Sequence, residues 1–261
     1  MKQLVFTTSV LLFSTFSFAQ HQGKVTYERI AQVRINISGA NSADVPQTRT
    51  DKFELTFANN QSLWKAAEKD NDDDNVSGDG MQVRIMIAGS DDVLYSNFAE
   101  AKRSELRVLF DKKFIVDDSI RTLKWKMGEE TKNILNHVCH KATATSIYPR
   151  MSMSIENGMM LRKEIQDTVN ITAWFTNDIP VSAGPAEYQG QLPGLILALD
   201  INNGRQVYKA IDITEKADLA IIKAPVGKKH YTPDEFRKER DKAMEEMQQN
   251  GMGGNRQIRI N

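Results

Sequence analysis

The 261-residue chain carries 34 basic and 34 acidic residues, and removal of a leader containing Lys2 would leave them at 33 to 34. Such a balance gives no case for nucleic-acid binding, which calls for a clustered basic face. The length fits one domain with appendages, and the single Cys139 excludes an internal disulfide.

The N-terminus predicts a secretory signal peptide. Lys2 precedes an apolar run over residues 4–18, and Ser17-Phe18-Ala19 has the small-x-small pattern of a cleavage site. The run is too short and too rich in Ser and Thr to predict a membrane span, and no second stretch of spanning length follows. We therefore expect cleavage near Ala19-Gln20 and a mature protein that does not span the membrane and resides in the periplasm or outside the cell.

Alternating apolar and polar residues then predict an antiparallel β protein, because side chains on a strand point to opposite faces in turn. The alternating or apolar segments are residues 25–37, 53–57, 62–65, 83–87, 93–95, 108–110, 114–116 and 123–127. Residues 99–107 are expected to form a short connector. Short strands broken by turn signals are typical of sheets, sandwiches and barrels.

An acidic segment over residues 70–80 has the opening spacing of a calcium loop at Asp70, Asp72 and Asp74. Asn75 stands where that loop needs Gly, and Met81 where it needs a bidentate Glu. The pattern therefore favours a solvated loop.

Candidate metal ligands lie in two places. His137 and Cys139 would share one face of a strand, with His140 on the other, and could begin a copper or zinc site. The alternative is that Cys139 packs as a small apolar residue inside the sheet.

Met151 and Met153 begin a cluster that continues to Met160, and thioethers bind Cu(I). The alternative is that these side chains pack on one face of a strand that ends in a hairpin turn at Asn157-Gly158.

No catalytic motif is recognised, although Glu164, Asp167, Asp178 and Glu187 are candidate acids. A charged surface is the simpler interpretation of these four residues, and a carboxylate pair that the sequence does not reveal is the alternative.

The segment from Ile179 to Ile201 is expected to organise the fold. Pro193-Gly194 fits the centre of a type II turn, with a positive φ at Gly194. The apolar run 195–201 then predicts a buried strand, and Asn203-Gly204 predicts a hairpin into a following strand.

After residue 226 the composition changes. Thr232-Pro233-Asp234-Glu235 predicts a helix start, with Phe236 and Met247 on its thin apolar stripe and a stop near Gly251. The expected layout is a signal peptide (1–19), a β domain (20–226) and a charged C-terminal helix with a flexible tail (227–261).

The segment around residue 194 resembles the GLPGLI family of exported bacterial proteins. The resemblance is carried by Leu192-Pro193-Gly194-Leu195-Ile196, by the preceding Gly184-Pro185 and Trp174, and by Cys139-His140-Lys141-Ala142. Gln191 stands where the family has its first Gly, and Gly190 lies one position earlier. The resemblance implies no biochemical activity, but it associates the chain with TonB-dependent outer-membrane receptors.

These observations predict a mostly β protein, built as a curved antiparallel sheet, a half-barrel or a sandwich. If it is a half-open barrel with an apolar ligand, Trp64, Trp125 and Trp174 are candidates to line it. The leading hypothesis for function is a binding or accessory module of the cell envelope, with an outer-membrane receptor or another envelope protein as its partner. Copper or zinc handling through His137, Cys139 and the methionines is the alternative.

Overall fold

The computed structural model describes residues 22–32, 48–68, 92–109, 112–156 and 159–252. For residues 148–156 and 159–164, Met244 and residues 247–252 it describes the backbone alone. The predicted calcium-loop segment, the predicted strand 83–87 and the N-terminal leader lie outside the described residues.

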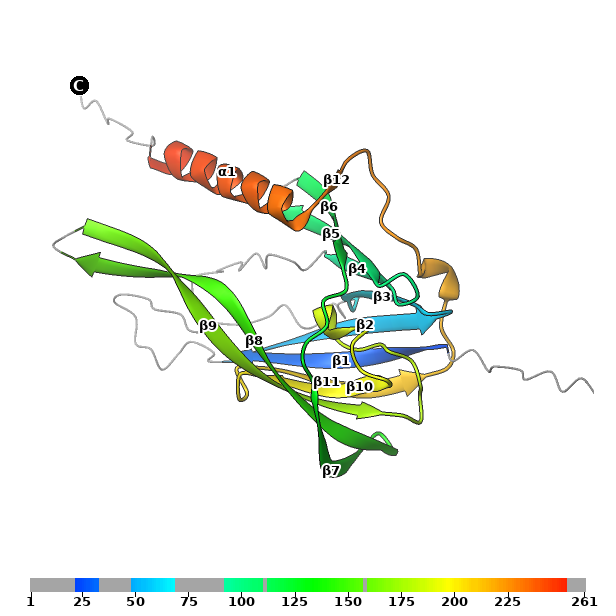
Figure 1. The fold of residues 1–261 in the computed structure, drawn as a ribbon. Helices are drawn as coiled ribbons and strands as arrows, with labels where there is room; N and C mark the ends of the chain where they lie inside the picture. Colours follow the sequence, from blue (N-terminus) through cyan, green and yellow to red (C-terminus); the bar gives the residue numbers. More distant parts are fainter. Residues whose placement is uncertain (1–21, 33–47, 69–91, 110–111, 157–158, 253–261) are drawn as a thin grey trace, which may run out of the picture.

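The described strands form one open sheet of twelve strands (Figure 1). Its order is β12-β6-β5-β4-β3-β2-β1-β11-β10-β9-β8-β7, and every pairing is antiparallel except β12 with β6. The predicted mostly β architecture is confirmed in its single-sheet form, and the described residues do not divide into the two sheets of a sandwich. The sheet curves strongly, and the β8–β9 hairpin extends beyond its neighbours.

The first half of the sheet is built from short strands in meander order. They are β1 (Gly23–Gln32), β2 (Thr48–Ala58), β3 (Gln61–Ala66), β4 (Val93–Asn97), β5 (Lys102–Leu109) and β6 (Lys112–Ser119). The expectation of a connector over 99–107 is wrong, because Lys102 to Leu106 pair with β4 and Lys102 to Leu109 pair with β6. Charged side chains at both parities of β5 hid its alternation.

The second half contains β7 (Lys126–Ile134), β8 (His137–Glu156), β9 (Met159–Thr176), β10 (Leu195–Ile201) and β11 (Gln206–Thr214). Two short 3-10 helices, η2 (Ala186–Tyr188) and η3 (Leu219–Ile221), lie in the connections, and β12 (His230–Tyr231) precedes the helix α1 (Pro233–Met252). The strand expected at 123–127 begins only at Lys126. The predicted turn at Asn157-Gly158 lies outside the described residues, but Glu156 and Met159 on either side of it are paired.

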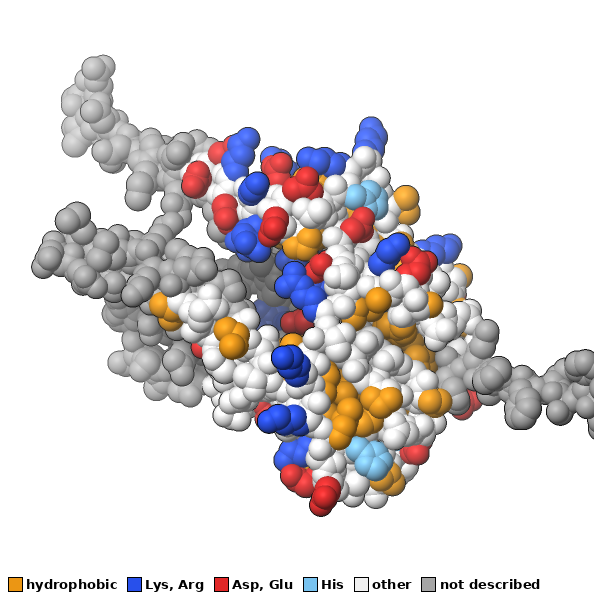
Figure 2. Space-filling view, viewed as in Figure 1, with side chains coloured by type: hydrophobic (Ala, Val, Ile, Leu, Met, Phe, Trp, Pro, Cys, Tyr) orange, Lys and Arg blue, Asp and Glu red, His pale blue; other side chains and the backbone are white. Residues whose placement is uncertain are grey.

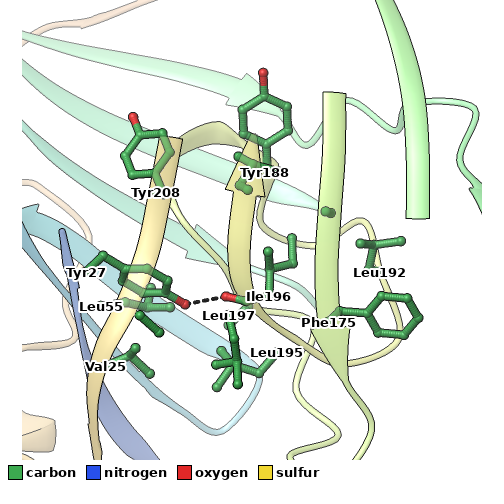
Figure 3. Packing of buried hydrophobic residues seen from close by; sticks show 14 of the residues in the cluster. Val25, Tyr27, Leu55, Phe175, Tyr188, Leu192, Leu195, Ile196, Leu197 and Tyr208 are labelled. Carbon is green, nitrogen blue, oxygen red and sulfur yellow. Dashed lines mark hydrogen bonds between the residues drawn. The ribbon is translucent and has the colours of Figure 1, made fainter. Parts of the chain in front are cut away.

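The core centres on β10, as the apolar run predicted. Leu195, Leu197 and Leu199 have no exposed surface and Ile196 has 1 %, so both faces of this strand are covered. The β10–β11 hairpin is confirmed, and its loop places Asn202, Asn203 and Gly204 at positive φ. Figure 3 shows this cluster, with Val25, Tyr27 and Leu55 packed beside the leucines.

The C-terminal helix begins where the sequence predicts. Thr232 and Glu235 form a capping box: the Glu235 N–H donates to the Thr232 hydroxyl (3.3 Å), and the Thr232 N–H donates to the Glu235 carboxylate (2.8 Å). Phe236 is buried against Phe114 and Val116 of β6 and so docks α1 on the sheet.

Candidate functional site

The GLPGLI-like segment folds back over the start of β10. The Leu195 N–H donates to the Ile179 carbonyl (3.1 Å), and the Ile196 N–H donates to the Ala183 carbonyl (3.0 Å). Residues 179–183 therefore lie beside residues 195–196, and the intervening loop closes over the sheet. This arrangement explains why an apolar strand is preceded by three prolines and three glycines.

Gly194 is required for a close backbone approach and not for a turn. A Cβ atom at this position would lie 2.0 Å from the Thr176 carbonyl oxygen, well inside any allowed contact. Its φ is not in the left-handed region, so the expected type II turn is wrong. The neighbouring Pro193 is exposed, which fits a purely conformational role.

Gly184 and Gly190 have different roles. A Cβ on Gly184 would lie 2.8 Å from the Ile196 side chain, so Gly184 packs directly on the strand. Gly190 has a φ of 73°, and a Cβ added there would lie 2.9 Å from the Ile120 side chain, so this glycine supplies both a left-handed bend and a close approach.

Gln191, which precedes Leu192-Pro193-Gly194, ties this loop to the connection before β7. Its side-chain oxygen accepts hydrogen bonds from the Leu123 N–H and from the Trp125 indole N–H, both at 3.1 Å. Its amide nitrogen donates to the Glu187 carbonyl (3.1 Å). A glycine could make none of these bonds, so the residue stabilises the loop through its side chain.

Three polar groups that the sequence did not single out hold the same region. The Tyr27 hydroxyl crosses β11 and donates to the Ile196 carbonyl at 2.6 Å (Figure 3). Gln189 is 2 % exposed and accepts a hydrogen bond from the Ser62 hydroxyl. No sequence signal marks such pairs, because their partners are more than a hundred residues away.

Cys139 lies on β8, next to the edge strand β7, and has no exposed surface. Burial raises the pKa of its thiol from 9.0 to about 11, and its Sγ lies 3.6 Å from the His137 carbonyl oxygen. Burial also raises the pKa of the Tyr27 phenol above its usual range. His137 is partly exposed and its Nδ1 lies 3.1 Å from the Asp178 carboxylate, so the two candidate ligands on this face have different surroundings.

The structure does not bring the methionines to this place. Cys139 and Met151 lie on the one continuous strand β8, twelve residues apart, which corresponds to about 40 Å along the strand. The side chains of Met151 and Met153 are outside the described residues. Among the described residues no group of three His, Cys, Asp or Glu is close enough to hold a metal ion. Copper or zinc binding by either group stays a prediction.

The three tryptophans have different nearest partners among the described residues. Trp64 stacks on Phe53 with ring centroids 5.0 Å apart, Trp125 bonds to Gln191, and Trp174 lies beneath the Lys132 ammonium group at 4.2 Å. Two pockets found elsewhere lie beside β5, β6 and the segment leading into α1, and neither contains a tryptophan.

The candidate acids are also dispersed. Asp178 pairs with His137, Glu187 is exposed on η2, and Asp167 lies on the extended part of β9. The side chain of Glu164 lies outside the described residues. The structure therefore places no two of the three described carboxylates together.

The feature best suited to recognition is the projecting part of the β8–β9 hairpin, residues 144–156 and 159–170, which we call the ribbon. The β7 ladder ends at Thr143 of β8, and the β10 ladder ends at Ile171 of β9. Beyond these residues the two strands pair only with each other among the described strands, in an unbroken register (Figure 1). The ribbon is about 40 Å long at the usual rise of a strand.

The two edges of the ribbon differ. Pro149 lies in β8 and has no N–H, and proline in a strand is confined to edges because it interrupts a ladder. Residues 159–170 of β9 contain no proline, and they lie beyond the point where the β10 ladder ends. Gln166, Thr168 and Asn170 are exposed there. The Asn170 carbonyl accepts a hydrogen bond from the Asn202 N–H (2.7 Å), but over residues 159–169 the outer edge of β9 pairs with no other described strand.

Comparisons with known proteins place part of the chain in context. Residues 125–198, which include Cys139, Trp174 and the segment through Ile196, match the model of a family described as a protein of unknown function (Porph_ging). None of the functionally curated proteins compared with the chain matches it. No helix in the described part of the chain is both long and apolar enough to cross a membrane.

Two crystal structures of PNGF-II resemble the fold. The structure in space group P21 shares 16 % identity with a TM-score of 0.52, and it covers 85 % of this chain and 34 % of its own. The structure in space group C2 shares 18 % identity with a TM-score of 0.49, covering 85 % and 32 %. The chain thus spans about a third of PNGF-II, and at this identity the likeness concerns the fold alone.

Proposed function

We propose that the chain is an exported binding module of the cell envelope that captures an extended segment of a partner protein along the β9 edge of the ribbon. The observation that carries the proposal is the outer β9 edge over residues 159–169, which no other described strand pairs with. An extended peptide can add to such an edge as a further strand, with main-chain hydrogen bonds giving affinity.

The energetics of a two-stranded ribbon support a partner. An isolated hairpin is marginally stable in water, and unpaired edges invite unwanted association. Proteins commonly blunt such edges with proline, as Pro149 does in β8. The β9 edge lacks a proline, which favours a functional role for that edge.

The proposed location of the protein in the cell envelope is supported by its sequence. The signal-like residues 1–19 and the resemblance to the GLPGLI family support export to the periplasm or beyond. The same resemblance favours an outer-membrane receptor of the TonB-dependent class, or another envelope protein, as the source of the captured segment. The match to a family of unknown function over residues 125–198 is compatible with this proposal.

Shortening the ribbon tests the proposal. Replacing residues 148–167 with Asn-Gly leaves Ile147 opposite Thr168 and joins them by a two-residue hairpin turn. The tagged wild-type chain and the shortened variant are expressed in the native cell, crosslinked in intact envelopes and purified. We expect a defined partner with the wild type and its loss with the variant, at an unchanged melting temperature. Recovery of the wild type only as a free monomer would contradict the proposal.

A further inference from the structure

A pocket of about 230 Å³ lies between the sheet and the start of α1. Its strands, β5 and β6, are near one end of the strand order, whereas β8 and β9 of the ribbon are near the other. Strand β5 contributes Arg103, Glu105 and Arg107, which are two residues apart and therefore share one face of the strand. The remaining lining residues are Val116, Asp118, Arg121, Pro233, Phe236, Arg237 and Arg240. The four from α1 follow helical spacing, so one face of the helix closes the pocket.

The lining is dominated by arginine. Five arginines face two carboxylates, so positive charge is in excess around a small volume. On the face shown in Figure 2, Lys and Arg side chains lie on and beneath the helix, interspersed with Asp and Glu side chains. Arginine presents a planar fork of donors that matches carboxylate and phosphate oxygens.

The two carboxylates hold the arginines of the sheet in place. Asp118 pairs with Arg103 at 2.9 Å and also with Arg121 at 3.4 Å, and Glu105 pairs with Arg107 at 2.9 Å. Asp118 is shared between two guanidinium groups, so its charge does not balance both. This sharing leaves N–H groups of Arg103 and Arg121 that can donate to a further acceptor on the sheet side of the pocket.

The arginines of the helix are held only weakly. Arg237 pairs with Asp234, whose side chain is 78 % exposed, and Arg240 pairs with Asp241, which is 54 % exposed. Exposed ion pairs of this kind contribute little to stability and exchange readily with other partners. Both guanidinium groups can therefore turn toward an anion in the pocket.

Arg107 joins the two sides. Its guanidinium lies 5.1 Å from the Phe236 ring centroid, and its buried Nε has no hydrogen-bond partner among the described residues. A buried donor without an acceptor is costly, so a small shift that lets an oxyanion accept from Nε gains a hydrogen bond. Arg29 has the same features, over Phe53 and beside Asp51, but it does not line the pocket.

We propose that this pocket binds a small oxyanion, the phosphate or carboxylate group of a larger envelope molecule, through Arg107, Arg237 and Arg240. Its volume is below that of typical pockets for drug-sized ligands, so it accepts a head group and leaves the rest of the molecule outside. The site is separate from the ribbon and does not depend on capture of a protein segment.

Calorimetric titration at low ionic strength tests the site with two probes, inorganic phosphate and glucuronate. We expect saturable binding of at least one probe to the full chain, weakened at least tenfold in Arg107→Gln and in Arg240→Gln. Arg29→Gln is the matched control and should bind as the wild type does. The probe that binds more tightly identifies which oxyanion the pocket prefers.

Arginine side-chain nuclear magnetic resonance gives a second readout that does not depend on a variant. The Nε–H signal of Arg107 should shift on saturation, whereas that of Arg29 should not. Binding of neither probe, or equal binding by the wild type and the exposed-helix variant Arg240→Gln, would overturn the proposal.

Discussion

At Gly194 the backbone passes so close to Thr176 that only a hydrogen atom fits on the Cα facing the carbonyl. The sequence pattern assigned this glycine to a turn. A short motif shows that a glycine is special without showing which neighbour makes it so. That neighbour belongs to β9, eighteen residues earlier in the chain, and pairing with β9 fixes the approach.

Replacement of Gly194 by Ala should destabilise the protein strongly. The added methyl would have to displace main-chain atoms, so we expect a loss of about 3 to 5 kcal/mol in the free energy of unfolding, the range of severe single substitutions. Gly128→Ala on the exposed β7 is the control, because its Cβ would meet only ordinary contacts at 3.5 Å or more. Denaturant unfolding of both variants measures the difference, and comparable stability of the two would contradict the close approach.

The buried thiol of Cys139 makes a prediction about pH. Because folding raises its pKa from 9.0 to about 11, the unfolded chain loses this proton first as the pH rises. The stability that the neutral thiol contributes is thus complete below pH 9 and is lost between pH 9 and 11. The free energy of unfolding of the wild type should fall more steeply over this window than that of Cys139→Ala, by at most about 1.4 kcal/mol per pH unit.

Thiol labelling gives an independent check of Cys139. At pH 8 the native protein should react slowly with an aromatic disulfide reagent, and the unfolded protein should react at the rate of a free thiol. Rapid labelling of the native protein would show that Cys139 is accessible, as a metal-ligand role would require.

Among the elements, the strands in which apolar and polar residues alternate clearly were predictable, and the charged or unusually long strands were not. Phe53, Leu55 and Phe57 alternate with polar residues, and all three lie in β2. The charged β5 gave no such alternation. The sequence also did not predict how long β8 and β9 are. Nor does a pattern of period two reveal whether a strand has one neighbour or two.

Hydrogen exchange should separate these elements. Residues 195–199 of β10 are buried; Ala198 and Leu199 lie between β9 and β11, and the Leu195 and Ile196 amides donate to the loop over residues 179–183, so these amides should exchange only through global unfolding. Amides of β9 at residues 159–168 belong to the ribbon and should exchange faster in the isolated protein. Mass spectrometry of overlapping peptides resolves the two segments. Equal protection of both would show that the ribbon is already covered in the isolated chain.

At the scale of the whole molecule, the chain forms an open sheet whose order depends on distant pairings. Strand β1 lies between β2, its neighbour in sequence, and β11, which begins at residue 206. Alternation predicted the strands, but it could not choose between a single curved sheet and a sandwich. That choice depends on the partner of each edge, which the periodicity of one strand does not contain.

The same limit applies to the candidate sites. His137 and Cys139 were correctly placed near one another because they are two residues apart on a strand. Their separation from Met151 could not be predicted, because a turn between residues 140 and 150 would have brought them together. The arginines of the pocket come from β5, from Arg121 just after β6 and from α1, and only the folded chain assembles them.

Site-specific photo-crosslinking tests most directly whether the ribbon is the binding surface. A photoreactive amino acid is placed at Thr168, on the exposed part of β9, and in a control at Val226, which is 94 % exposed away from the ribbon. Illumination of intact cells should give one discrete crosslinked product from Thr168 and none of that size from Val226. Absence of a product at Thr168, or the same product from both positions, would contradict a partner on the β9 edge.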